Sequence, residues 1–132
     1  MRVKRDIVVT AIVTEKLKEQ LRQEVQASLD RVDASQKELE SQSRRFMLQL
    51  PSADMVSAVR QQVEAELRRH ETLRRELRER QDEIASLKLG DRITYTTLEG
   101  YVDVQVGDNL LDKIGNAEIL IEDGVILEIK EA

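Results

Sequence analysis

The chain has 132 residues, of which 36% are charged and only 2% aromatic, and it carries a formal net charge of −5. Large apolar side chains are therefore too few for one large core, and no segment approaches the roughly 20 consecutive apolar residues of a membrane span. The lack of cysteine excludes disulfide frameworks, thiolate zinc sites and cysteine nucleophiles, and it fits a reducing compartment. We expect a cytoplasmic protein, not held in a membrane, with long and largely exposed helices.

The first element in chain order is a β-strand that is buried within a sheet. Residues 3–13 (VKRDIVVTAIV) are rich in β-branched side chains and are apolar on both alternating faces from Ile7 onward. Thr14 then fits the N-cap of a helix, and Glu15 falls in the first turn, where its charge complements the helix dipole. We therefore assign residues 1–13 to a strand that joins strands from elsewhere in the chain.

Two long helices follow this strand. In the first, apolar residues recur every three or four positions as far as Leu50, with polar Gln36 and Ser43 at two inward positions. Pro51 lacks an amide hydrogen and disfavours helical geometry in the residue before it, so the first helix should end there. The second helix repeats apolar residues at intervals of seven and should stop at Gly90, a typical helix-terminating glycine.

Both helices are about 37 residues long, or about 55 Å at 1.5 Å per residue. Equal lengths predict an antiparallel coiled-coil hairpin over residues 14–89, with its turn near Pro51. The numbers of facing residues should then sum to about 102, which places Val32 against His70. The apolar residues that we expect to lie off this seam, and to leave surface for a second chain or a client, are Leu17, Leu21, Met47, Leu48 and Leu67.

After Gly90 the pattern changes to the alternation that is typical of strands. Residues 92–98 and 101–106 are predicted to be two strands joined near Glu99 and Gly100. The connection that follows, residues 107–116, is rich in turn residues and has room for one helical turn.

The last two predicted strands, residues 118–122 and 125–130, flank Asp123 and Gly124. Asp-Gly is a strong signal for a type I′ hairpin, whose two central residues both need positive φ. Residues 90–132, which hold ten acidic and three basic residues, are therefore an acidic β module. With the N-terminal strand they form a small, mostly antiparallel sheet, and the fold class is α+β.

Segments at both ends of the chain are similar to a known family. Residues 9–16 read VTAIVTEK and residues 104–129 read VQVGDNLLDKIGNAEILIEDGVILEI; the segments 106–108 and 122–129 carry most of the likeness. On these segments the chain resembles the YlqD-like family of small bacterial proteins. The function of that family is unassigned, so the resemblance implies the architecture and a bacterial cytoplasmic setting and transfers no site residue.

No catalytic, cofactor or metal site is predicted. His70 is the only histidine, so one chain cannot assemble a Ser-His-Asp triad or a multi-histidine metal site. We interpret His70 as a seam residue, with a pH-sensitive contact as the alternative. The acidic residues of the C-terminal module do not match the spacing of a calcium-binding EF-hand loop, and turn geometry accounts for Asp108 and Asp123. We therefore expect a protein that is not an enzyme.

The hairpin tip, residues 44–56 around a turn predicted at residues 49–54, gathers apolar residues where a helix pair has least need of them. We predict a partner-binding site there, formed by Phe46, Met47, Leu48 and Met55. Methionine adapts to irregular surfaces, and phenylalanine supplies contact area. The alternative interpretation is that Phe46, Leu50 and Val56 close the end of the coiled coil.

The second helix offers a candidate site for RNA. Residues 68–80 contain six arginines, and the candidate RNA-binding residues are Arg68, Arg69, Arg74, Arg75 and Arg78. Glutamates interleave with them, and Glu64 with Arg68 and Glu71 with Arg75 are spaced for ion pairs four residues apart along one exposed face.

Short strands rich in β-branched residues leave edges that tend to pair, so we expect a homo-oligomer. The sequence thus predicts a non-catalytic scaffold, adaptor or holdase-like protein that binds a protein partner or client. The alternative is an RNA- or ribosome-associated factor that binds through the arginine-rich second helix.

Overall fold

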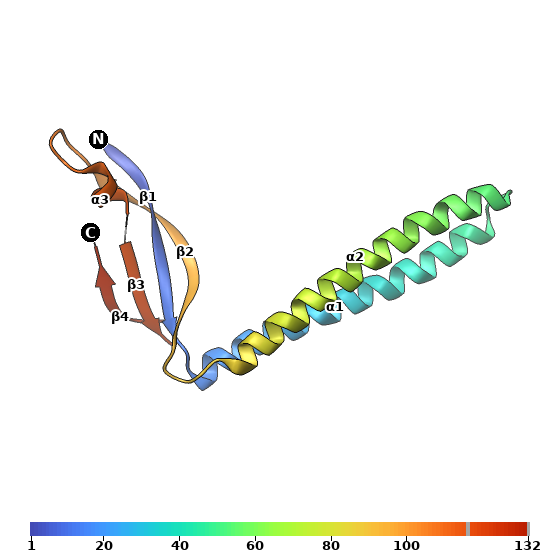
Figure 1. Cartoon of the computed structure of the whole chain (residues 1–132), viewed down its shortest axis with the longest axis horizontal. Coiled ribbons are helices and arrows are strands. Elements are labelled where there is room, and N and C mark those ends of the chain that lie inside the picture. The colour runs from blue at the N-terminus through green and yellow to red at the C-terminus, as the bar shows by residue number, and fades with distance from the viewer. Residues whose placement is uncertain (116, 132) are drawn as a thin grey trace. The chain divides into compact units, whose positions relative to one another are not determined.

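The computed structural model describes residues 1–115 and 117–131. Its elements in chain order are β1 (Arg2–Ile12), α1 (Glu15–Leu48), α2 (Ala53–Ser86), β2 (Arg92–Asp103), α3 (Leu110–Ile114), β3 (Ala117–Glu122) and β4 (Val125–Lys130). Figure 1 shows the long antiparallel pair α1 and α2 and the sheet that the strands form. The predicted α+β class, a long helical hairpin with a small, mostly antiparallel sheet, is confirmed, and the pairing of β1 with β3 is the one parallel pairing among the described residues.

The chain divides into two compact units. The helical unit is Gln20–Ser86, and the sheet unit is Met1–Glu19 together with Leu87–Ala132. The N-terminal strand belongs to the same unit as the C-terminal strands, although about 70 residues of helix separate them in the sequence.

The four strands of the sheet lie in the order β2-β1-β3-β4. β1 is a central strand, antiparallel to β2 and parallel to β3, and β3 is antiparallel to β4. The register places Val9 opposite Ile119 and Ala11 opposite Ile121 on one face, and Val9 and Ala11 are buried. The prediction that the first strand joins the C-terminal strands is therefore confirmed.

The predicted break near Glu99 and Gly100 is wrong. β2 runs without interruption through both residues, and it pairs with β1 instead of folding back on itself, with Gly100 opposite Arg5. Neither residue adopts the positive φ of a tight hairpin turn. A Cβ at Gly100 would lie 2.6 Å from Cδ1 of Ile7, so the glycine permits close packing against β1 rather than a turn.

The β3–β4 hairpin forms as predicted. Asp123 (φ 48°) and Gly124 (φ 85°) both have positive φ, as a type I′ turn requires. The same turn is joined to the start of α1, because the hydroxyl of Thr14 donates to Asp123 Oδ1 over 2.6 Å and accepts from the amide of Leu17 over 3.1 Å. Thr14 is thus the predicted N-cap and also fixes the β3–β4 turn.

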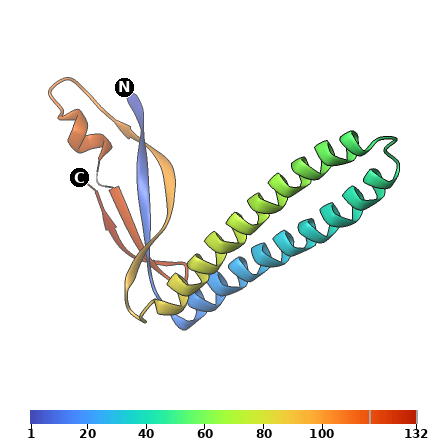
Figure 2. The same ribbon diagram turned by 45° about the vertical axis from the view of Figure 1, so that its right-hand side comes forward.

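In the helical unit, α1 and α2 lie side by side in opposite directions (Figures 1 and 2). The residues that are buried in this unit are Leu21, Val25, Leu29, Val32, Ser43 and Ile84. The turn falls at residues 49–52, around Pro51, and Ser52 Oγ accepts from the amide of Met55 at the start of α2 over 3.2 Å. The predicted hairpin is confirmed.

α2 ends at Ser86, earlier than the predicted stop at Gly90. The residues beyond it are hydrogen-bonded to Val13, which directly follows β1. The amide of Gly90 donates to Val13 O over 2.9 Å, and the amide of Val13 donates to Asp91 O over 2.8 Å. This backbone pairing competes with a further helical turn, although Gly90 has the positive φ (91°) expected of a helix-terminating glycine.

The expectation that Leu17 and Leu21 lie off the seam is wrong. Both are buried, because their four-residue spacing continues the inward stripe of Val25 and Leu29 towards the start of α1. Leu48, by contrast, is highly exposed, as predicted, while Met47 and Leu67 are half-buried.

Within residues 1–115 and 117–131, none of the helices is long and apolar enough to cross a membrane.

Candidate binding surfaces

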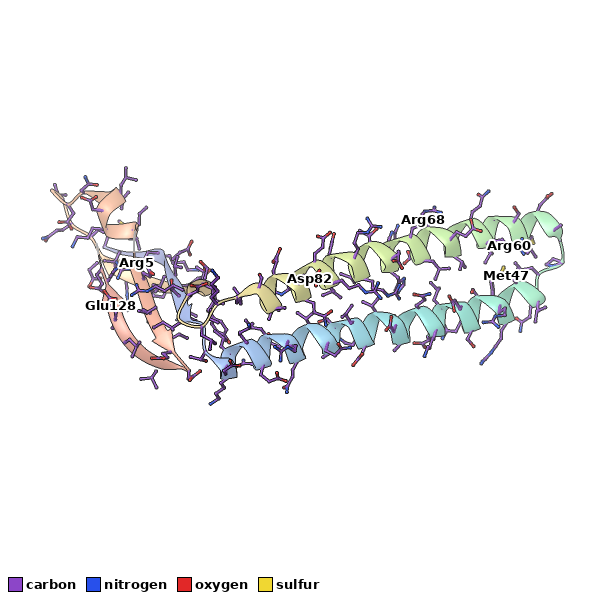
Figure 3. All side chains as sticks on the ribbon, turned by 60° about the horizontal axis from the view of Figure 1, so that its bottom comes forward. Arg5, Met47, Arg60, Arg68, Asp82 and Glu128 are labelled. Atoms are coloured by element: carbon purple, nitrogen blue, oxygen red, sulfur yellow. The ribbon has the colours of Figure 1, made fainter. Side chains whose placement is uncertain are left out.

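The hairpin turn separates inward from outward apolar residues. Leu48 is 86% exposed, and Phe46 and Met55 are each about half exposed. Met47, Leu50 and Val56 are half-buried. Figure 3 places Met47 in the last turns of α1, close to the loop. The structure therefore divides the four predicted partner-binding residues, and we call Phe46, Leu48 and Met55 the tip patch.

Local backbone and cap interactions hold the tip patch in place. The amides of Gln49 and Leu50 donate to Phe46 O and Met47 O over 3.1 and 3.3 Å, which tightens the end of α1. The Ser52 cap starts α2 on the other side of Pro51. The half-buried Leu50 and Val56 agree with the end-closing interpretation, whereas Phe46, which that interpretation also includes, is about half exposed.

The candidate RNA-binding arginines of α2 differ in whether they form ion pairs. Arg69 is paired with Glu66, and Arg74 with Glu71 (2.6 Å) and Asp33 (2.9 Å). Arg68, Arg75 and Arg78 are exposed and form no ion pair within the described part of the chain. Figure 3 shows Arg68 on α2.

The ion pairs within α2 are also not those that the sequence predicts. They join residues three apart, as in Glu66–Arg69 and Glu71–Arg74, and the four-apart pairs Glu64–Arg68 and Glu71–Arg75 are not formed among the described residues. Glu71 pairs with Arg74 instead of Arg75 because Arg74 lies on the inward side of α2, from which it reaches both Glu71 and the opposite helix.

Arg74 joins the two helices of the hairpin. Its side chain is mostly covered and donates to Asp33 and Gln36 on α1 and to Glu71 on its own helix. The hydrogen bond to Asp33 is the largest cause of a raised pKa at Arg74; burial opposes the shift, and Glu71 adds to it. Arg74 is therefore committed to the hairpin and unsuited to binding phosphate.

His70 lies in a shallow groove between the helices. The groove has a volume of about 340 Å³ and is lined by Val32 and Ser28 of α1 and by His70, Leu73 and Leu77 of α2, among others. His70 and Val32 thus meet in one groove, as the predicted register requires. The Nδ1 atom of His70 lies 2.8 Å from Glu66 O, one turn earlier in its own helix.

Three acidic residues of the sheet unit each accept a hydrogen bond at a different place. Asp108 accepts from the amide of Gln105, Glu118 from the hydroxyl of Thr10, and Asp123 from Thr14. Among the residues that the structure describes, no three His, Cys, Asp or Glu side chains are arranged to hold a metal ion.

A buried arginine in the sheet unit has no counterpart in the sequence predictions. Arg5 on β1 is almost fully covered; it donates to Lys113 O in α3 over 3.2 Å and to Glu131 Oε1 over 3.1 Å. It therefore ties α3 and the chain beyond β4 to the central strand. The arginine alternates with apolar residues on the inner face of β1, between Val3 and Ile7, and that position is the signal that could have predicted its burial.

β4 carries a second apolar surface that sequence reasoning missed. Its apolar side chains, each more than half exposed, are Val125, Ile126, Leu127 and Ile129. The sequence signal for it is that residues 125–130 (VILEIK) are apolar on both alternating faces, more than a strand with one buried face needs.

Comparisons with known proteins agree on the fold and give no activity. No curated protein matches the chain. A crystal structure of a protein of unknown function from Synechococcus sp. WH 8102 matches with a TM-score of 0.86 and 28% sequence identity, over 99% of this chain and 95% of that one. The family model described as YlqD protein matches residues 1–130, so the chain belongs to the YlqD family.

Proposed function

We propose that the chain is a non-catalytic, homo-oligomeric binding protein of the bacterial cytoplasm, a scaffold, adaptor or holdase-like module that takes its partner at the tip patch. The observation that carries the proposal is the exposure of Phe46, Leu48 and Met55 around a short, capped turn. Exposed apolar side chains at one end of a helix pair favour a binding partner, because covering them removes apolar area from water.

The chemistry of the tip patch favours a particular kind of partner. Phe46 and Leu48 supply apolar contact area, and the unbranched Met55 adapts to different shapes. Arg44 and Arg45 at the end of α1 are exposed, so a partner that combines apolar anchors with acidic residues is favoured over a basic one. An unfolded or partly folded polypeptide satisfies these requirements, which is the basis of the holdase-like interpretation.

Replacing Phe46, Leu48 and Met55 together with serine tests the tip patch. Because each large apolar side chain contributes about 1.5–3 kcal/mol when fully buried, we expect partner binding to weaken by more than about tenfold. The probe is a heat-unfolded model enzyme, whose aggregation is followed by light scattering with and without the YlqD chain. A photoreactive side chain at position 48 identifies the natural partner in cell extract.

The matched control removes exposed apolar side chains elsewhere. Val106→Ser with Leu111→Ser changes two exposed residues of the sheet unit and is expected to leave client protection intact. Equal protection by the tip variant and the wild-type chain would contradict the proposal, as would a tip variant that loses protection only because it loses helicity.

The RNA-binding alternative has one favourable observation. Arg68, Arg75 and Arg78 are spaced by seven and three residues, so they share one face of α2, and they are exposed and form no ion pair within the described residues. If they bind RNA, the affinity for a mixed-sequence single strand should fall steeply between about 50 and 200 mM salt.

Changing these three arginines to glutamine should then weaken RNA binding, measured by fluorescence anisotropy, while the serine tip variant binds RNA as the wild type does. Weak binding that is the same for wild-type and glutamine variants would eliminate the RNA alternative.

A further inference from the structure

The two edges of the sheet differ in the side chains they present. β2 lies at one edge and β4 at the other. β2 carries charged Arg92, Glu99 and Asp103, and its pairing with β1 is interrupted at Tyr95, which has no partner residue. Charged side chains and such bulges are devices that keep an exposed edge from pairing with another chain. β2 is therefore a protected edge.

β4 also carries charged residues, Glu128 and Lys130, and a bulge at Leu127, but a larger share of its residues is apolar and exposed. Four of its six residues are apolar and more than half exposed, and its outer side has no neighbouring strand within the described residues. The outward backbone amides and carbonyls of an edge strand form a template for another strand. Arg5 also holds Glu131, just beyond β4, against the central strand, so this edge is fixed in position. β4 thus fits an added β-strand.

The charges at the end of β4 favour antiparallel pairing with β4 of a second copy of the chain. When two identical strands pair antiparallel about a two-fold axis, one residue faces itself and the others pair reciprocally. Centring the pair on Ile129 sets Glu128 of each copy opposite Lys130 of the other, which gives two pairs of opposite charge. Both side chains are exposed and lie 4.0 Å apart within one chain, so each is accessible to a partner copy.

The other registers around it are worse. Centring the pair on Glu128 places two carboxylates directly opposite each other, and centring it on Lys130 places two ammonium groups opposite each other; both are destabilising. Centring it on Leu127 places the bulge of β4 in the middle of the new pairing, because Leu127 has no partner residue in β3. The register centred on Ile129 sets opposite charges against each other and keeps the bulge residue Leu127 away from the centre of the new pairing.

We propose that two copies of the chain pair antiparallel along β4, centred on Ile129, and join their four-stranded sheets into one continuous sheet. The proposal rests on the homo-oligomeric part of the proposed function and names the surface that forms the oligomer. It removes the exposed edge at β4 and leaves the protected edge β2 at both ends of the joined sheet.

Charge reversal in β4 gives the test. Glu128→Lys alone places lysine opposite lysine in both reciprocal pairs, and Lys130→Glu alone places glutamate opposite glutamate, so each variant should dimerise about tenfold more weakly. In a mixture of the two variants, every lysine at these positions faces a glutamate in the heterodimer. We expect the mixture to recover the dimer, measured by sedimentation velocity at low salt, and this recovery also shows that both variants are folded.

A matched pair of edge substitutions provides the control. Ile129→Lys places two lysines opposite each other and should give a monomer, whereas Leu98→Lys on β2, also at an exposed apolar position, should leave the dimer intact. A wild-type chain that is monomeric at micromolar concentration overturns both the β4 pairing and the homo-oligomeric part of the proposed function.

A wild-type dimer that Ile129→Lys does not weaken overturns the β4 pairing alone. Client protection measured on the same samples separates the two proposals, because the β4 variants keep the tip patch unchanged. Loss of protection in the tip variant with an intact dimer supports the β4 pairing and the tip patch as independent surfaces.

Discussion

Val9→Asp is expected to lower the free energy of unfolding of the sheet unit by about 3–5 kcal/mol, because it places a carboxylate in the apolar interior without a partner. Val9 is only 6% exposed and lies on the central strand opposite Thr96 of β2 and Ile119 of β3. Neither neighbour offers a positive charge. A loss of this size is comparable to the whole stability of a small unit, so the variant should be largely unfolded in the sheet.

Val8→Asp is the matched control, since Val8 is the next residue of the same strand and points to the other face, where it is 37% exposed. We expect a loss of about 1 kcal/mol or less there. Equal effects of the two substitutions would mean that the assignment of inner and outer faces is wrong.

The two tyrosines allow the sheet to be followed separately from the helices. Tyr95 and Tyr101 both lie in β2, and the chain has no tryptophan. Tyrosine fluorescence during urea unfolding therefore reports on the sheet, while the circular dichroism signal of helix reports mainly on α1 and α2. Val9→Asp should move the tyrosine transition to much lower urea concentrations or abolish it, and leave the helical transition nearly in place.

The sequence predicted the helical unit well because its determinants are local. Pro51 interrupts the helix whatever surrounds it, and the seven-residue apolar pattern places the inward stripe on each helix. The β3–β4 turn was predictable for the same reason, since Asp123 and Gly124 adopt positive φ more readily than other residues. The N-cap role of Thr14 was equally local.

The errors arose where distant segments decide the outcome. Glu99 and Gly100 read as a turn in isolation, but β1 is 11 residues long and offers β2 a continuous partner. Gly90 should have ended α2, yet pairing with Val13 ends it sooner. In both cases a backbone partner about 75 to 100 residues away in the chain replaced the local preference.

The surroundings of the candidate residues were predicted in part. Leu48 and Met55 were correctly placed at the turn, but the sequence could not show that Met47 faces partly inward. The arginines looked equivalent in the sequence, whereas Arg74 contacts the opposite helix and Arg75 does not. The exposure of β4 was missed because strand order is not determined by alternation alone.

Leu29→Ala in α1 is expected to lower the free energy of unfolding of the helical unit by about 2–4 kcal/mol. Leu29 is 8% exposed and lies in the middle of the inward stripe, so truncation removes buried apolar contacts and leaves a cavity between the helices. Urea unfolding followed by the helical circular dichroism signal measures the loss.

Leu48→Ala, at the end of the same helix, removes an identical side chain that is 86% exposed, and it should change the stability by no more than about 0.5 kcal/mol. The contrast bears directly on function. If Leu48 contributes nothing to folding but its replacement weakens client protection, its apolar surface acts in binding. If Leu48→Ala destabilises the hairpin as strongly as Leu29→Ala, the side chain closes the end of the helix pair, and the tip patch is a structural feature instead of a binding site.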